Sequence, residues 1–105
     1  MTWKRGDLVD GNYIKLSRGL LDWEWYTDIN TTRLFIHMLL KANWKDGNFK
    51  GTTIPRGSFV TSIRKLSDET GLSDREIRTA ISHLKKTGEV TSKTTNKFSV
   101  FTVVK

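Results

Sequence analysis

Two short helical segments separated by one tight turn limit the folds that this chain can adopt. Ser62 can cap a helix predicted over 63–70, and Gly71 can end it, because glycine readily adopts the left-handed conformation found after helices. A capping box, Ser73-Asp74-Arg75-Glu76, then opens a helix predicted over 74–87. Two helices joined by so short a turn containing glycine form a helix-turn-helix.

Apolar spacing predicts which side of each helix is buried. In the helix over 74–87, one stripe faces inward and consists of Ile77, Ala80, Ile81 and Leu84. An earlier helix is predicted over 31–44, with Asp28 or Asn30 as its cap. Its apolar residues recur at helical spacing and are Leu34, Phe35, Met38, Leu39 and Ala42.

Strand patterns flank the helix-turn-helix on both sides. Residues 57–61 include the aromatic Phe59 and the β-branched Val60 and Thr61, and this composition predicts a short strand. Residues 90–104 alternate well enough for two strands, with Thr94-Thr95-Asn96-Lys97 as the turn between them. A hairpin that follows a helix-turn-helix is called a wing. The predicted fold class is therefore mainly α with a small antiparallel β-hairpin, a winged helix-turn-helix.

The remaining segments carry weaker patterns. Residues 1–12 are polar and predict a flexible lead-in, which leaves 13–105 as one domain. Residues 13–26 predict a short strand or turn leading into a short helix, and residues 45–51 predict a surface loop. The aromatic set Trp23, Trp25 and Tyr26 is interpreted as core, with a protein–protein contact as the alternative.

Positive charge is concentrated in the second half of the chain. The whole sequence carries a net charge of +7, of which residues 1–55 contribute +2 and residues 56–105 contribute +5. The side of the 74–87 helix that faces away from the apolar stripe is basic and hydroxyl-bearing, with Arg75, Thr79, Ser82 and Lys86 on it. Arg78 and Lys85 lie together on one flank. Such a face suits a recognition helix in the major groove of DNA, although a merely solvated face is the alternative.

The turn of the predicted wing is also basic. Lys93 and Lys97 stand beside Thr95 and Asn96. A compact tip of this composition suits DNA phosphates or a minor-groove edge. The predicted DNA-binding residues are therefore Arg75, Arg78, Thr79, Ser82, Lys86, Lys93, Thr95, Asn96 and Lys97.

Several function classes are not expected. The chain has no cysteine, and His37 and His83 have no metal-ligand partner at a suitable spacing, so no metal site is predicted. No phosphate-binding glycine loop or nucleophile motif occurs, so we expect neither an enzyme nor a cofactor. No secretory signal and no membrane-spanning run of about 18 apolar residues is present, so no membrane partner is expected.

The order of several segments resembles the N-terminal domain of phage replisome organisers, a family related to DnaD-type primosome proteins of Gram-positive bacteria and their phages. The resemblance covers residues 11–105. It is carried by Tyr13–Leu16, Asp22–Tyr26, Arg33–His37, Leu39–Asn43, Arg56–Ser62, Lys65–Ser67, Thr70–Ser73 and Thr95–Phe98.

This resemblance implies a phage or prophage replication-initiation protein in the cytoplasm of a bacterial host cell. It would bind duplex origin DNA and help assemble replication proteins such as a helicase or its loader. Such organisers commonly carry a further domain after the wing, so the chain could be the N-terminal part of a longer protein. Two alternatives stay open: a small winged-helix transcriptional regulator, and a protein-interaction or homo-oligomerisation module of a primosome.

Overall fold

The computed structural model describes residues 13–95 and 98–104, and this part of the chain forms three α-helices and five short strands. The elements in chain order are the 3-10 helix η2 (Arg18–Asp22), α1 (Ile29–Lys41), β1 (Gly47–Phe49), β2 (Thr52–Ile54), β3 (Ser58–Thr61), α2 (Ile63–Thr70), α3 (Asp74–Lys86), β4 (Val90–Thr94) and β5 (Ser99–Val103). The predicted lead-in over 1–12 lies outside the described residues.

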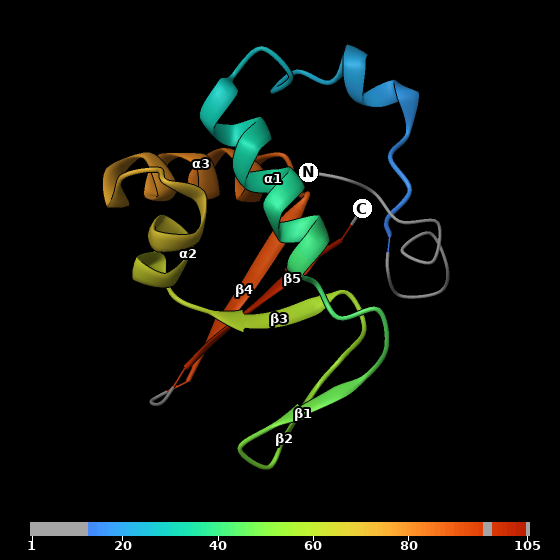
Figure 1. Cartoon of the computed structure of the whole chain (residues 1–105), viewed down its shortest axis with the longest axis vertical. Helices are drawn as coiled ribbons and strands as arrows, with labels where there is room; N and C mark the ends of the chain where they lie inside the picture. Colours follow the sequence, from blue (N-terminus) through green and yellow to red (C-terminus); the bar gives the residue numbers. More distant parts are fainter. Residues whose placement is uncertain (1–12, 96–97, 105) are drawn as a thin grey trace.

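A three-stranded antiparallel sheet lies beneath the helices (Figure 1). Its strand order is β3-β5-β4, so β5 is the central strand. Phe101 of β5 is opposite Phe59 of β3 on one side and Ser92 of β4 on the other. The strand predicted over 57–61 therefore joins the hairpin predicted over 90–104, and the sheet is larger than the single hairpin of the predicted fold class.

The ends of α2 and α3 follow the local sequence signals. The Ser62 hydroxyl accepts a hydrogen bond from the Lys65 backbone at 3.1 Å, and Gly71 ends α2 with φ 81°. Both bonds of the capping box are formed, since Ser73 Oγ accepts from Glu76 N at 3.1 Å and Glu76 Oε1 accepts from Ser73 N at 2.8 Å. These helix predictions are confirmed to within one residue.

The first helix begins and ends earlier than the predicted range of 31–44. Asp28 is its N-cap, with Oδ1 accepting from Thr31 N at 3.0 Å, so that α1 begins at Ile29. It ends at Lys41 because the next residues leave the helix to meet β3. The Asn43 backbone N–H donates to the Ser58 carbonyl at 3.0 Å, and the Gly57 N–H donates to the Asn43 carbonyl at 2.8 Å.

A second, two-stranded sheet begins inside the surface loop predicted over 45–51, so that prediction is wrong for residues 47–49, which form β1. Phe49 of β1 is opposite Thr52 of β2, which leaves Lys50 and Gly51 as a two-residue turn. Both have positive φ, 49° and 79°, as a type I′ hairpin turn requires. The hairpin projects away from the helices (Figure 1).

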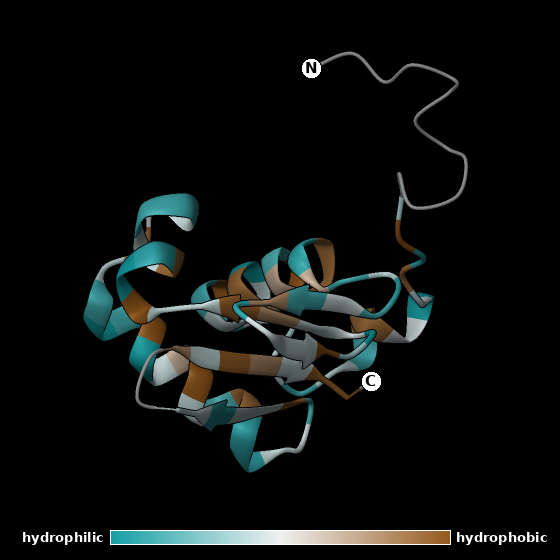
Figure 2. Ribbon diagram, turned by 90° about the horizontal axis from the view of Figure 1, so that it is seen from below, coloured by the Kyte–Doolittle hydropathy of each residue, from teal (hydrophilic) through white to brown (hydrophobic). Residues whose placement is uncertain are grey.

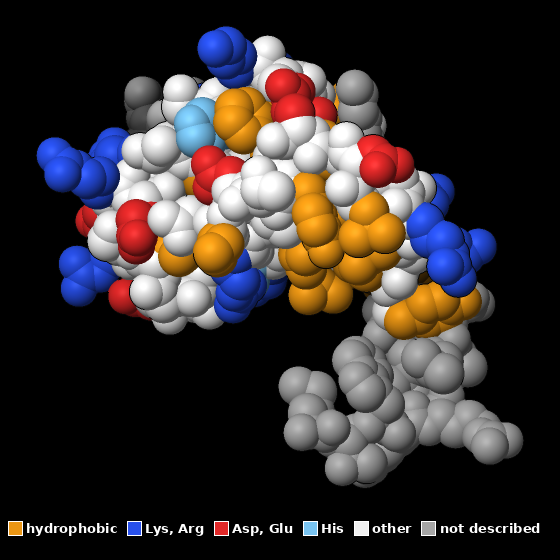
Figure 3. All heavy atoms as spheres, turned by 90° about the horizontal axis from the view of Figure 1, so that it is seen from above, with side chains coloured by type: hydrophobic (Ala, Val, Ile, Leu, Met, Phe, Trp, Pro, Cys, Tyr) orange, Lys and Arg blue, Asp and Glu red, His pale blue; other side chains and the backbone are white. Residues whose placement is uncertain are grey.

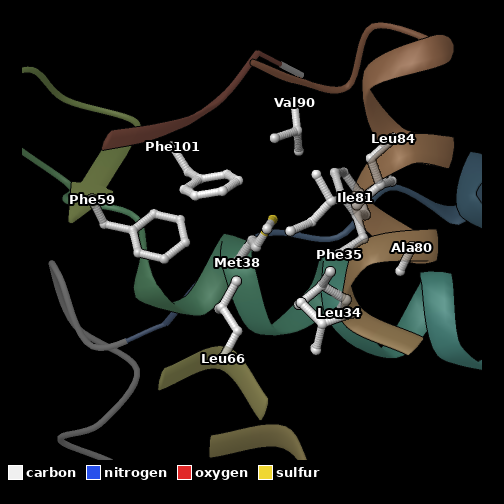
Figure 4. Packing of buried hydrophobic residues seen from close by; sticks show 11 residues of the cluster. Leu34, Phe35, Met38, Phe59, Leu66, Ala80, Ile81, Leu84, Val90 and Phe101 are labelled. Atoms are coloured by element: carbon white, nitrogen blue, oxygen red, sulfur yellow. The ribbon is translucent and has the colours of Figure 1, made fainter. Parts of the chain in front are cut away.

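The core lies between the helices and the inner face of the three-stranded sheet. Side chains from α1, α2, α3 and all three strands meet there (Figure 4), with Leu34, Met38, Leu66 and Leu84 fully buried. Hydrophobic residues alternate with polar ones along the helices and strands (Figure 2). This pattern is expected where each element buries only one of its sides. This core holds α3 across the sheet with its opposite side in solvent.

Candidate nucleic-acid interface

The residues predicted to face outward from α3 do lie on its outer side. The inward stripe of Ile77, Ala80, Ile81 and Leu84 is buried. A helix with about 3.6 residues per turn must then turn the intervening positions away from the core. The exposed residues on that side are Arg75, Thr79, Ser82 and Lys86.

The basic side chains of α3 are available for a ligand. Within the described part of the chain, Lys41 forms an ion pair with Glu69 and Arg64 forms one with Asp68, while His37 and His83 lie within 3.3 Å of the Glu69 and Asp28 carboxylates. None of these contacts engages an Arg or Lys of α3. Glu76, next to Arg75, is turned toward α1, where its Oε2 accepts from Asn30 Nδ2 at 3.2 Å. The pKa of Glu76 lies below its ordinary value, chiefly because its carboxylate accepts a hydrogen bond from the Ser73 backbone N–H. Hydrogen bonds with the Ser73 and Asn30 side chains lower the pKa further.

A groove of about 470 Å³ runs between α3 and the β4–β5 hairpin. Arg78 and Lys85 line its helical wall, together with Ser82. Four hydroxyl side chains, from the start of α2 and from both strands, complete the polar lining: Ser62, Ser92, Thr94 and Ser99. We call this surface the α3–hairpin groove. Guanidinium, ammonium and hydroxyl groups in one cleft are the usual partners of phosphate oxygens.

Sequence reasoning missed part of the α3–hairpin groove. Arg78 and Ser82 were predicted site residues, whereas Lys85 was recognised only as a neighbour of Arg78 on one flank of the helix. Ser92 and Ser99 carried no signal of their own. The helical wheel placed Arg78 and Lys85 together, but only the packing of α3 on the sheet determines what that flank faces.

Lys93 lies on the opposite face of the β4–β5 hairpin from the α3–hairpin groove. Ser92 is paired with the buried Phe101, and Lys93 is paired with Val100, one residue away on each strand. Because successive side chains of a strand point to opposite faces, Lys93 points away from the core side of the sheet. It is exposed and lines a second groove with residues of β2.

The remaining predicted site residues belong to the hairpin turn. Thr95 is exposed, and its backbone N–H donates to the Phe98 carbonyl at 2.8 Å. Asn96 and Lys97 lie outside the described residues. The structure therefore brings Arg78 and Ser82 beside the hairpin. Arg75, Thr79 and Lys86 lie along the outer side of α3. Lys93 and Thr95 belong to the hairpin itself.

Two of the aromatic residues before α1 are engaged inside the domain. Trp23 packs against Phe35 with ring centroids 4.8 Å apart, and its Nε1 donates to the buried Glu89 at 3.3 Å. Trp25 Nε1 donates to Thr87 Oγ1 at 2.9 Å. Both indoles pack against the core, as predicted, whereas Tyr26 is exposed.

Comparisons of the chain with protein-family models, with curated proteins and with solved structures found no match. Across the described residues, no helix has the length and apolar character needed to cross a membrane. In the same residues no three His, Cys, Asp or Glu side chains are grouped to hold a metal ion.

Proposed function

We propose that this domain is a winged helix that binds duplex DNA through α3 and the β4–β5 hairpin. The order α1, β3, α2, α3, β4, β5 supports this, because it places a tight turn between two helices and a hairpin directly after the second. In that architecture α3 is the recognition helix and the hairpin is the wing.

One observation carries the proposal: the basic side of α3, whose Arg and Lys side chains form no ion pair with another described residue, continues into a basic, hydroxyl-lined groove at its flank. Arg75 lies in the first turn of α3 and would contact a base edge, since the N-terminal residues of recognition helices make such contacts. Arg78 and Lys85, which line the α3–hairpin groove, would contact phosphates. Base readout and backbone anchoring would then come from adjacent surfaces of one helix.

The proposed role in replication initiation comes from the resemblance to phage replisome organisers, and with it the expected helicase or helicase-loader partner. A transcriptional regulator would use the same local chemistry. The DNA sequences selected by the domain separate the two roles. Enrichment of a replication origin of the source genome supports the organiser, whereas enrichment of promoter sites supports a regulator.

The alternative of a protein-interaction module has less support from Trp23 and Trp25 than the sequence suggested. Their indole N–H groups donate to Glu89 and Thr87, so neither is a free interface anchor. Hydrophobic side chains do gather on the face seen in Figure 3. The exposed apolar residues of the segment before α1 include Leu16, Leu21 and Tyr26.

Titration of a labelled duplex at two salt concentrations tests the proposal. Displacement of roughly six phosphate counterions predicts an affinity loss on the order of 10³ between about 50 and 200 mM salt. Absence of binding at the lower salt, or affinity indifferent to salt, would contradict DNA binding. Sedimentation without DNA distinguishes the rival, because a tight oligomer that ignores DNA favours an interaction module.

A further inference from the structure

The end of the domain that projects away from the helices exposes two aromatic rings with lysines against them. Trp44 is 58% exposed and Phe49 is 36% exposed. Lys45 Nζ lies 5.1 Å from the centroid of the Trp44 ring, and Lys50 Nζ lies 5.4 Å from that of Phe49. We call these four residues the aromatic–lysine surface. Neither ring belongs to the core cluster.

The charge of this region favours an anionic partner. Residues 1–40 contain five basic and five acidic side chains, whereas residues 41–56 contain four basic and one acidic. The single carboxylate, Asp46, accepts a hydrogen bond from the Arg56 backbone N–H at 2.8 Å. The positive excess in the first half of the chain therefore comes from the segment that forms this hairpin.

Polar groups suited to a nucleobase stand beside both rings. Asn43 and Asn48 line a hollow of about 260 Å³ next to Trp44, and the same two residues line another of about 230 Å³ next to Phe49. No hydrogen bond from another described residue engages either side-chain amide. An amide offers both a donor and an acceptor, which is what the edge of an unpaired base requires.

The aromatic–lysine surface is fixed to the domain. Phe49 meets Phe98 edge to face at 5.1 Å between centroids, which ties the β1–β2 hairpin to the segment leading into β5. The backbone bonds between Asn43 and residues 57 and 58 hold the other side. An exposed ring on a fixed element stacks on a ligand at little conformational cost.

We propose that the aromatic–lysine surface binds single-stranded nucleic acid, with bases stacked on Trp44 and Phe49 and phosphates on Lys45 and Lys50. Base–aromatic stacking beside lysines is the common mode of sequence-tolerant single-strand binding. A duplex keeps its base faces stacked internally and offers nothing to the rings. This surface is separate from the α3–hairpin groove, with which it shares no lining residue, and the proposal does not depend on duplex binding by α3.

The test measures fluorescence anisotropy of a labelled oligothymidylate of about 12 nucleotides, a length within single-strand site sizes, at low salt. Trp44→Ala should weaken binding at least about fivefold, while Trp44→Phe, which keeps a ring, should lose less. Ile29→Ala is the matched control, because Ile29 is 81% exposed at the start of α1. Circular dichroism of each variant checks the fold.

Each outcome decides for or against the proposal. No binding of the oligothymidylate by the parent chain overturns it, as does equal affinity of the parent and Trp44→Ala. A change in sedimentation of Trp44→Ala with unchanged oligothymidylate binding identifies a protein contact instead. Arg75→Ala, measured on a duplex, reports on α3 alone, so failure of one site is distinguishable from failure of the other.

Discussion

His83 of α3 stacks on Trp25, with ring centroids 4.2 Å apart and ring planes 7° from parallel. Its Nδ1 also lies 2.9 Å from Thr31 Oγ1 and 3.3 Å from Asp28 Oδ2 at the start of α1. The imidazole therefore joins α3 to α1 and to the segment before it. This side of α3 is used for internal packing, and the outer side is left for a partner.

We expect His83→Ala to lower the free energy of unfolding by about 1–3 kcal/mol, since it removes a stacked ring and a partly buried hydrogen bond. Urea denaturation measures the change. Ser82→Ala, one residue earlier and exposed, is the control and should stay within about 0.5 kcal/mol. Duplex affinity of folded His83→Ala should match the parent. A large affinity loss without a stability loss would instead place His83 in the interface.

Glu76 should make the stability of the domain depend on pH in the acidic range. Hydrogen bonds from Ser73 and Asn30 lower its folded pKa below the ordinary value of 4.5. Its contribution is therefore fully present above that value and is lost as the pH falls through the lower folded pKa. The difference in unfolding free energy between the parent and Glu76→Gln should shrink as the pH drops. Glu24→Gln controls for the loss of one negative charge. If the difference in unfolding free energy between the parent and Glu76→Gln did not change with pH, the charge of Glu76 would not stabilise the capping box.

Arg75 should carry sequence preference if α3 enters the major groove. Arg75→Ala is expected to cost about 1–3 kcal/mol on a selected duplex and to relax preference at one base position. Competition between selected and random duplexes measures both effects. Arg33→Ala, which removes an equal charge from the exposed side of α1, should change neither. If Arg75→Ala keeps the affinity and preference of the parent while folded, α3 is not the recognition helix.

Lys93 should contribute through phosphates rather than through bases. Lys93→Ala is expected to weaken all duplexes alike and to reduce the slope of log affinity against log salt by about one unit. The same titration on Lys15→Ala, in the segment before η2, controls for net charge. A preference altered at one base position would be inconsistent with a backbone contact.

The local features of this fold were predictable because they depend on neighbouring residues. Ser62, Ser73 and Glu76 satisfy backbone groups within three residues of themselves, and Gly71 takes a conformation that its own lack of a side chain permits. The buried stripe of α3 follows from helical periodicity alone. The outer residues Arg75, Thr79 and Lys86 could therefore be assigned before any tertiary contact was known.

The β1–β2 hairpin depended on contacts that the sequence does not display. Its turn is Lys50-Gly51 rather than the Asn-Gly or Asp-Gly pair that marks such turns, and its strands have only three residues each. Phe49 is held by Phe98, far along the chain. Such short strands give no periodic pattern in the sequence, so the aromatic–lysine surface could be recognised only from the folded structure.

The buried side and the basic side of α3 were predictable without a structure, because both follow from helical spacing. The neighbours of each flank of α3, in contrast, depend on how the helix packs against the rest of the domain. Because α3 packs on the sheet, Arg78 and Lys85 face the β4–β5 hairpin and His83 faces α1. Because of the strand pairing, Lys93 lies on the opposite face of that hairpin. A helical wheel fixes angles about one axis, and the neighbours at each angle are set only by contacts between residues distant in the chain.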